Sequence, residues 1–509
     1  MTTIMPLINK TYLLCLLALV ATACKKSENQ PDEPTIDSHP ELVAACQHIE
    51  GGGAAVTGGD GGMVYWVNRL DDAVDPASGL PMRGTLRYAV TQIGARRVLF
   101  SVSGTIHLNK KFGDLRIQND NLTIDGQSAP GDGICIADYP LVIDKANNVI
   151  VRFLRVRLGD ESHKEFDAVS VNDAQGVVLD HLSCSWSVDE CVSCYGNTDF
   201  TMQYCIVSES LKNSVHGKGN HGYGGIWGGT NASFHHNLLA HHDSRNPRFD
   251  HDYVDGTHAG PIDFVNNVVY NWGGNSAYGG EGSTNAAGGR HVNFVNNYYK
   301  PGHATKSGVK ERLLNPTTKC DYISKGKHEG CYPKYGGEVE PGKFYLTGNI
   351  MDGSTDVTNN NWNGVFPDEA LKKDLCKAET RWTAGLTPLK NEQTAQDAYE
   401  TVLAKAGCSH VRDVVDTRII REVREGTYTY QGSNGSTGGL IDTQSDVGGW
   451  PELKEGTAPA DSDYDGMPDE WEEKYGLNPK DASDAKQKTL VTGHTNLDVY
   501  MCHKVSHLY

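Results

Sequence analysis

Residues 261–267 read Pro-Ile-Asp-Phe-Val-Asn-Asn, and residues 291–297 read His-Val-Asn-Phe-Val-Asn-Asn. In both stretches β-forming and polar residues alternate, and the stretch ends in turn-forming residues. The same kind of phrase recurs at 121–125, 148–152, 176–181, 199–204, 231–237 and 343–349. Most of these phrases lie roughly 20 to 35 residues apart, a spacing typical of solenoid repeats. The pattern predicts an all-β chain that forms a right-handed parallel β-helix with one such strand in each coil.

The asparagines that close the phrases predict a ladder inside the solenoid. Asparagine tolerates the left-handed backbone conformation and bonds turn backbone groups, so equivalent asparagines of successive coils are expected to stack. A β-propeller would need antiparallel blades, and a β-sandwich would need hairpins. Hairpin dipeptides such as Asn-Gly between paired strands are scarce, which disfavours both alternatives.

Composition and charge narrow the possible functions. The 509 residues include 57 glycines and only 8% aromatic residues, and the mean hydropathy is −0.47, so the chain is rich in turns and poor in material for a large helical core. The net charge of −18 excludes nucleic acid as an expected partner, because phosphate binding requires an excess of Lys and Arg. An anionic ligand would need a locally basic groove.

The first residues predict export. Lys10 precedes the apolar run 12–20, which is too short to span a bilayer, and Ala21-Thr-Ala-Cys24 follows. This order is typical of a lipoprotein signal peptide over residues 1–23 with Cys24 as the lipid acceptor, and an ordinary signal peptide is the alternative. We expect a monomeric outer-membrane lipoprotein, on the periplasmic or cell-surface face, with a disordered tether over residues 24–45.

The C-terminal segment 456–509 contains a calcium-loop pattern. Acidic residues stand at positions 1, 3, 5, 9 and 12 around Gly466, as in an EF-hand loop. They are Asp461, Asp463, Asp465, Asp469 and Glu472. The spacing predicts a structural Ca²⁺ site.

Two further features interrupt or constrain the repeat. Residues 394–407 begin with Thr394 and end with Gly407, which predicts a short helix outside the coil. Export would permit disulfides, and the cysteines that flank polar or helical insertions suggest the bridges Cys320–Cys331 and Cys376–Cys408.

Several ordered motifs make the chain recognisable. They are Gly51-Gly-Gly-Ala-Ala-Val-Thr-Gly-Gly, Arg83-Gly-Thr-Leu-Arg, Phe100-Ser-Val-Ser-Gly-Thr-Ile, Leu122-Thr-Ile-Asp-Gly-Gln, Val178-Leu-Asp-His181, His235-His-Asn237 and Arg245-Asn-Pro-Arg248. Over about residues 46–450 the chain resembles the pectate lyases of polysaccharide lyase family 1, here as a bacterial lipoprotein member. The resemblance implies a β-helix domain over residues 46–455 and calcium-dependent elimination on polygalacturonate.

The resemblance also assigns roles to basic residues. It places the catalytic base at Arg245 and substrate contacts at Arg248 and Lys212, with Lys218 in the adjacent glycine-rich loop. Arg155 and Arg157 share a strand face and would either extend this basic strip or point into solvent.

The acidic ligands implied by the resemblance are less regular. Asp167 corresponds to a calcium ligand before a strand, and Asp189 and Glu190 lie at the end of the following coil. The family has two carboxylates four residues apart, but Ser193 stands four residues after Asp189. Asp189, Glu190 or both would then complete the site.

The chemistry explains why both sets of residues are needed. Elimination removes a poorly acidic proton beside a carboxylate, so it requires a base and a cation that stabilises the developing charge. The alternatives are a non-catalytic β-helix adhesin or glycan-binding protein, a lyase for another uronate or for methylated pectin, and a glycosidase with paired carboxylates. His181, His235 and His236 are expected to serve core hydrogen bonding rather than zinc.

Overall fold

The structure is a computed structural model, and it describes residues 36–249, 260–280, 290–317, 342–367 and 373–509. The predicted signal peptide, Cys24 and the Cys320–Cys331 bridge lie outside these residues. In the described ranges, no helix combines the length and the apolar character needed to cross a bilayer.

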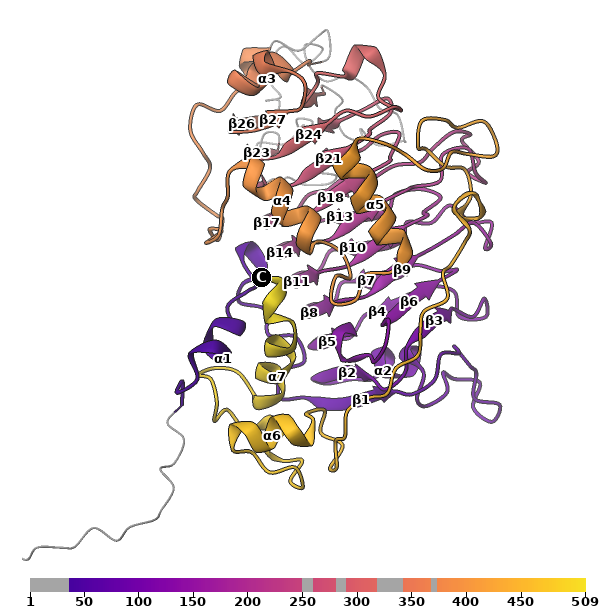
Figure 1. The fold of residues 1–509 in the computed structure, drawn as a ribbon, viewed down its shortest axis with the longest axis vertical. Coiled ribbons are helices and arrows are strands. Elements are labelled where there is room, and N and C mark those ends of the chain that lie inside the picture. Colours follow the sequence, from indigo (N-terminus) through magenta and orange to yellow (C-terminus); the bar gives the residue numbers. More distant parts are fainter. Residues whose placement is uncertain (1–35, 250–259, 281–289, 318–341, 368–372) are drawn as a thin grey trace, which may run out of the picture.

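Three parallel sheets form the body of the molecule (Figure 1). The ten-stranded sheet contains β1 (Met63–Val67), β2 (Arg96–Phe100), β5 (Leu122–Asp125), β8 (Asn147–Arg152), β11 (Gln175–Asp180), β14 (Thr198–Gln203), β17 (Thr230–His235), β20 (Ile262–Val265), β23 (His291–Val295) and β26 (Lys343–Thr347). The nine-stranded sheet contains β3 (Gly104–His107), β6 (Ile134–Ala137), β9 (Arg155–Arg157), β12 (Ser183–Ser185), β15 (Ile206–Ser208), β18 (Leu238–Ala240), β21 (Val268–Tyr270), β24 (Tyr298–Lys300) and β27 (Ile350–Met351). The eight-stranded sheet contains β4 (Leu115–Ile117), β7 (Leu141–Asp144), β10 (Val169–Asn172), β13 (Val192–Tyr195), β16 (Ile226–Trp227), β19 (Arg248–Phe249), β22 (Ala277–Gly279) and β25 (Leu314–Pro316).

The predicted parallel β-helix is confirmed. All eight phrases of the sequence coincide with strands of the ten-stranded sheet, one in each coil from β5 onward, and only the first two strands, β1 and β2, lack the phrase. Gln175 of β11, for example, lies in register with Asn147 of β8 and with Thr198 of β14. Each strand thus hydrogen-bonds to the equivalent strand of the preceding and following coil.

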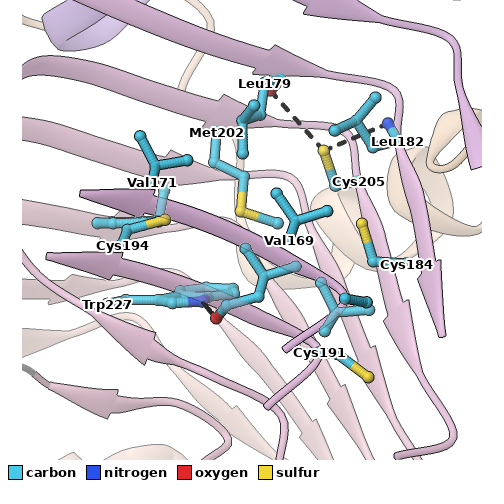
Figure 2. Packing of buried hydrophobic residues seen from close by; sticks show 14 of the residues in the cluster. Val169, Val171, Leu179, Leu182, Cys184, Cys191, Cys194, Met202, Cys205 and Trp227 are labelled. Carbon is cyan, nitrogen blue, oxygen red and sulfur yellow. Dashed lines mark hydrogen bonds between the residues drawn. The ribbon is translucent and has the colours of Figure 1, made fainter. Parts of the chain in front are cut away.

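Apolar side chains from all three sheets fill the interior. In the section of Figure 2, Val169 and Val171 of β10, Leu179 of β11 and Met202 of β14 point into this core, together with several cysteines. Burial raises the pKa of the Cys191 thiol to about 12, so this side chain behaves as a small apolar residue.

The predicted Cys376–Cys408 bridge is wrong. Both residues are free cysteines, and the Cys408 thiol instead donates to the carbonyl oxygen of Phe153 at 3.3 Å.

The predicted asparagine ladder is confirmed along the turns after the ten-stranded sheet. The Nδ2 of Asn237 donates to Oδ1 of Asn267, Asn267 donates to Asn297, and Asn297 donates to Asn349, at 3.0, 3.1 and 2.9 Å. These asparagines are fully or almost fully buried. Since each side chain also bonds backbone groups, the ladder satisfies the polar groups of turns that water does not reach.

A second ladder consists of the residues that occupy, in successive coils, the turn position just before that of Asn237. Phe153, His181, Tyr204 and His236 all have φ between 50° and 55°, and neighbouring rings stack at centroid distances of 4.6, 5.0 and 4.9 Å. His181 and His236 are therefore structural, and His235 is buried beside His236 with the two Nδ1 atoms 2.9 Å apart.

Two helices cover the outer face of the nine-stranded sheet (Figure 1). They are α4 (Ala395–Lys405), which begins at the predicted Thr394 cap, and α5 (Val414–Glu425). Arg157 binds Asp413 and Asp416 of this helical region at 2.9 Å, and Arg155 binds Asp413 at 3.2 Å. These arginines hold the helix on the sheet, so neither prediction for them, a basic strip or solvated charges, was right.

The remaining helices are α1 (Pro40–Ala45), α2 (Leu86–Thr91), α3 (Thr355–Asn359), α6 (Asp469–Tyr475) and α7 (Asn496–Val505). The C-terminal segment returns to the first coils, where α7 lies beside α1 (Figure 1). Leu42, Leu99 and Trp471 belong to one apolar cluster. The predicted tether over 24–45 therefore ends too late, because residues 40–45 form a packed helix.

The asparagine ladder yields a stability prediction. Replacing Asn267 with Ala leaves Asn237 and the Phe234 carbonyl without their partners, which should lower the free energy of unfolding by about 3 kcal/mol. Urea denaturation measures the change. Asn359→Ala at the exposed end of α3 is the control and should change stability by less than about 0.5 kcal/mol. An equal effect of both substitutions would contradict a stabilising role of the ladder.

Candidate active site and calcium sites

The predicted site residues lie in the turns that lead into the eight-stranded sheet. Asp167 precedes β10, Asp189 and Glu190 precede β13, and Arg245 precedes β19. The turns are in register: the Ala168 amide donates to the Glu190 carbonyl at 3.0 Å, and β-bridges join Glu190 to Tyr223 and Tyr223 to Ser244. Because equivalent positions of successive coils lie about 4.8 Å apart, residues far apart in sequence meet at this corner.

Three carboxylates come together on the first two of these rungs. Ligand oxygens of Asp167, Asp189 and Glu190 all lie within 4.8 Å of one another. Burial, and secondarily the Asp189 carboxylate, raise the pKa of Asp167 to about 7. The cost of holding three carboxylates together is what a divalent cation would relieve, and carboxylate oxygens are the ligands that Ca²⁺ prefers. The residues present therefore fit a calcium ion.

Ser193 occupies the place where the sequence departs from the pattern of the family that it resembles. It lies on β13 in register with Ser170, and the Ser170 hydroxyl donates to Asp167 Oδ2 at 2.9 Å. Glu190, three residues before Ser193, is 3% exposed and is one of the three clustered carboxylates.

Arg245 lies two rungs above the Asp189–Glu190 turn. Its φ of 57° lies in the left-handed region, as does that of the turn residues Phe153, His181, Tyr204 and His236. The guanidinium forms an ion pair with Glu190, its centre lies 4.5 Å from the Tyr223 ring, and Nε donates to the Tyr278 hydroxyl at 3.4 Å. The arrangement places a strong cation directly beside the carboxylates.

The other predicted basic residues differ in position. Lys212 Nζ lies 2.8 Å from Asp243, and Asp243 precedes Arg245 by two residues. The Arg248 guanidinium lies 6.0 Å from the centre of the Tyr278 ring. These two residues therefore share the corner with Arg245. Lys218 is exposed in the loop that follows Lys212, where its amide donates to His216 Nδ1 at 3.1 Å.

Sequence reasoning missed Tyr223, Tyr278, His216 and His221. All four lie at the same corner, and Asp189, His216 and His221 form a second group with ligand atoms within 4.8 Å of one another. His216 and His221 were visible in the loop motif that carries Lys218. Their proximity to Asp189 depends on how the loop folds back, which the motif alone does not indicate.

The C-terminal acidic residues form two overlapping groups. Asp461, Asp463 and Asp465 make one, and Asp465, Glu472 and Asp484 make the other. Glu472 is fully buried, and neither of its oxygens has a hydrogen-bond partner among the described residues. Burial, with the surrounding carboxylates, raises the pKa of Glu472 to about 8 and that of Asp465 to about 7. Buried unpaired carboxylates of this kind fit a Ca²⁺ ion.

Two details of the predicted loop differ in the structure. Both oxygens of Asp469 accept hydrogen bonds from Ser462, at 2.7 Å, so Asp469 caps the loop and takes no part in either group. Asp484, 12 residues beyond Glu472, supplies a carboxylate that the EF-hand pattern does not contain. Helix α6 begins at Asp469, near the end of the loop. Residues 449–468, which include the start of the loop and the segment before it, form no helix. The segment therefore resembles an EF-hand only in the spacing of its acidic residues.

Comparisons with known proteins identify the family. No family model matches the chain. The probable pectate lyase C of Aspergillus flavus is 32% identical over 466 residues, which cover 90% of this chain and 93% of the relative. That of Aspergillus terreus is 30% identical over 471 residues, which cover 90% and 96%. The chain therefore belongs to the pectate lyases, and it is a polysaccharide lyase.

Solved structures give weaker similarity. The cedar pollen allergen Jun a 1 has 17% identity and a TM-score of 0.45, covering 70% of this chain and 91% of the allergen. A pectate lyase from Bacillus sp. N165, solved with trigalacturonate, has 16% identity and a TM-score of 0.43, covering 70% and 98%. The family assignment rests on the sequence identity to the fungal relatives.

The C-terminal site yields a pH-dependent prediction. Without calcium, folded Asp465 and Glu472 keep their protons up to about pH 7 and 8, whereas the unfolded chain releases them near 3.8 and 4.5. The native state then binds more protons, so stability falls as pH rises from 5 to 8, and calcium should remove this fall. Thermal unfolding at pH 5.5 and 8 in EGTA and in calcium measures it.

The variant Glu472→Gln provides a second test of this site, because it removes one buried charge from it. It should abolish most of the calcium-induced stabilisation at pH 8. Equal effects of EGTA at both pH values, or an unchanged response in the variant, would contradict calcium binding at this loop.

Proposed function

We propose that this lyase cleaves de-esterified polygalacturonate by β-elimination, with Arg245 as the base and Ca²⁺ as the cofactor, and releases 4,5-unsaturated oligogalacturonides. The observation that carries the proposal is the cluster of Asp167, Asp189 and Glu190 on two consecutive coils, with Arg245, two coils further on, paired with Glu190. The similarity to probable pectate lyases of Aspergillus supports pectate as the substrate.

The two halves of the site supply what elimination requires. Asp167, Asp189 and Glu190 would hold the calcium ion, which neutralises a uronate carboxylate and makes the adjacent proton more acidic. Arg245 would take that proton. Its guanidinium is normally protonated, so the base role requires that its pairing with Glu190 be weakened when Glu190 turns to the cation.

Basic residues around Arg245 account for binding of an acidic polymer by an acidic protein. Lys212 and Arg248 lie on the same corner, and their side chains would contact uronate carboxylates although the chain carries a net charge of −18. Arginine is well suited to this task because its planar fork binds carboxylates with two hydrogen bonds. Lys218 would reach the substrate from the loop above.

The alternatives make different demands on this corner. A non-catalytic adhesin has no need for arginine and lysine side chains beside three carboxylates, so the convergence of Arg245, Lys212 and Asp167 disfavours it. A lyase acting on methylated pectin would not need the acidic group. A different uronate polymer would use the same residues, and the substrate assay below distinguishes it.

We further propose that the protein is exported, lipid-anchored at Cys24 on the outer membrane and monomeric. The proposal rests on the signal-like sequence of residues 1–24. The fungal relatives bear on the lyase activity and do not bear on the anchor. Mass spectrometry of the mature N-terminus in the native host tests it, because an unmodified Cys24, or cleavage at another residue, would contradict lipid attachment.

The calcium requirement is tested with polygalacturonate. The purified protein should produce ultraviolet-absorbing unsaturated ends in calcium, and EGTA should remove the activity. Circular dichroism in EGTA, below the unfolding temperature, separates loss of the active-site cation from unfolding at the C-terminal site. An increase in absorbance that EGTA does not change in the folded protein would contradict the metal role, and activity only on methylated pectin or alginate would change the substrate.

The base is tested by Arg245→Lys, which keeps a positive charge but moves it away from the reacting carbon. The rate constant kcat should fall by about 10³-fold or more, as expected for the loss of a catalytic group. Arg424→Lys on the exposed face of α5 is the matched control and should keep full activity. Retained activity in Arg245→Lys would move the base to another residue.

A further inference from the structure

A stack of rings connects the glycine-rich loop to Arg245. The His216 ring stacks on the His221 ring at 3.8 Å with an interplanar angle of 8°, and His221 packs on Tyr223 at 3.8 Å. The Tyr223 ring in turn lies 4.5 Å from the Arg245 guanidinium. His216 and His221 are each 5% exposed, so the stack is an interior feature although it belongs to a loop.

The same stack contacts the cluster of carboxylates formed by Asp167, Asp189 and Glu190. His221 Nε2 lies 2.6 Å from Asp189 Oδ1, which is close enough for an N–H···O hydrogen bond or for two ligands of one cation. His216 Nε2 lies 3.4 Å from Glu165 and 3.8 Å from Asp189. Tyr223 joins the two halves of the site because its rung lies between that of Glu190 and that of Ser244.

Asp189, His216 and His221 could form a metal site or a set of hydrogen bonds, and a hydrogen bond of His216 distinguishes the two interpretations. The Lys218 amide donates to His216 Nδ1 at 3.1 Å, so Nδ1 is an acceptor and the proton of the neutral ring is on Nε2. A metal ligand would need Nε2 unprotonated, with the other ring nitrogen as the donor. His216 therefore directs an N–H group towards Glu165 and Asp189, which disfavours a zinc ion held by His216.

We infer that His221 and Tyr223 are positioning residues: they hold the cluster of Asp167, Asp189 and Glu190 and the Arg245 guanidinium in fixed positions relative to each other. His221 fixes the orientation of Asp189, and Tyr223 holds the Arg245 guanidinium over the rung that separates the two. The inference rests on the proposed function, since it assigns roles relative to the calcium ligands and the base.

The loop backbone explains how the stack is kept in place. The His221 amide donates to the Lys212 carbonyl at 2.7 Å, and the Asp243 amide donates to the Gly222 carbonyl at 2.9 Å. Gly222 has a φ of 86°, and a Cβ there would lie 2.8 Å from Lys212 Cα, so only glycine permits this close return of the loop. The loop that carries Lys212 and Lys218 thereby delivers His221 and Tyr223 to the site.

Separate substitutions test the two contacts. His221→Phe keeps the stacked ring and removes the donor, so the Ca²⁺ dissociation constant of the active site should rise by roughly 10 to 100-fold, the usual effect of losing a group that orients a metal ligand. His221→Gln retains an N–H donor and should restore part of the affinity. Isothermal titration with CaCl₂ measures both, and His507→Phe on the surface is the control.

Tyr223→Leu removes the surface beneath Arg245 and should lower kcat roughly 10 to 100-fold with little change in KM, because a misplaced base affects the chemical step. Tyr223→Phe keeps the ring and should stay within about twofold of the unchanged protein. Tyr430→Leu is the matched control: the Tyr430 ring lies 5.2 Å from the Arg418 guanidinium, away from the carboxylate group, and its loss should leave kcat unchanged.

The titration also separates the possible failures. Glu472→Gln identifies the C-terminal calcium signal, so the remaining signal belongs to the active site. If the unchanged protein has no lyase activity or no second calcium signal, the proposed function fails. If it has both, and His221→Phe and Tyr223→Leu fold normally but behave like their controls, the positioning roles are wrong. Stoichiometric binding of ZnCl₂ that His221→Phe abolishes would overturn the hydrogen-bonding interpretation in favour of a metal site.

Discussion

The in-register hydrogen bonding of successive coils determines almost everything else in this protein. Each strand pairs in parallel with the equivalent strand of the next coil, so each position of a turn lies directly above the same position in the turn before it. A side chain in a turn must therefore pack against the side chain at the same position of the next coil, which is either the same residue or a compatible one. The Asn237–Asn267–Asn297 ladder and the Phe153–His181–Tyr204–His236 stack are two solutions to this constraint.

The same constraint builds the candidate active site. At the corner before the eight-stranded sheet, stacking places carboxylates on two rungs, Tyr223 on the third and Arg245 on the fourth. Burial, together with the like charge of Asp189 on the adjacent rung, raises the pKa of Asp167, and a cation bound at this corner would offset the repulsion between the carboxylates. Arg245 contributes a positive charge to this corner by pairing with Glu190.

The sequence predicted what depends on periodicity. The alternation and closing asparagines of residues 261–267 and 291–297 identified the coil and its ladder, and the spacing of Asp461, Asp463 and Asp465 identified an acidic loop. Contacts between distant segments were not predictable in this way. Asp484 and Glu472, Arg157 and Asp416, and His221 and Asp189 meet because of how insertions fold back on the coil. Such folding back depends on tertiary packing and leaves no repeat in the sequence.

The most direct test of the account is a crystal structure of Arg245→Lys with CaCl₂ and trigalacturonate. We expect one ion at the corner, bonded to oxygens of Asp167, Asp189 and Glu190 at about 2.4 Å and to a uronate carboxylate, with Glu190 turned away from residue 245. The sugar carbon that loses its proton should face residue 245. An ion bound elsewhere in the groove, or a substrate seated on another sheet while these carboxylates hold no cation, would contradict the account.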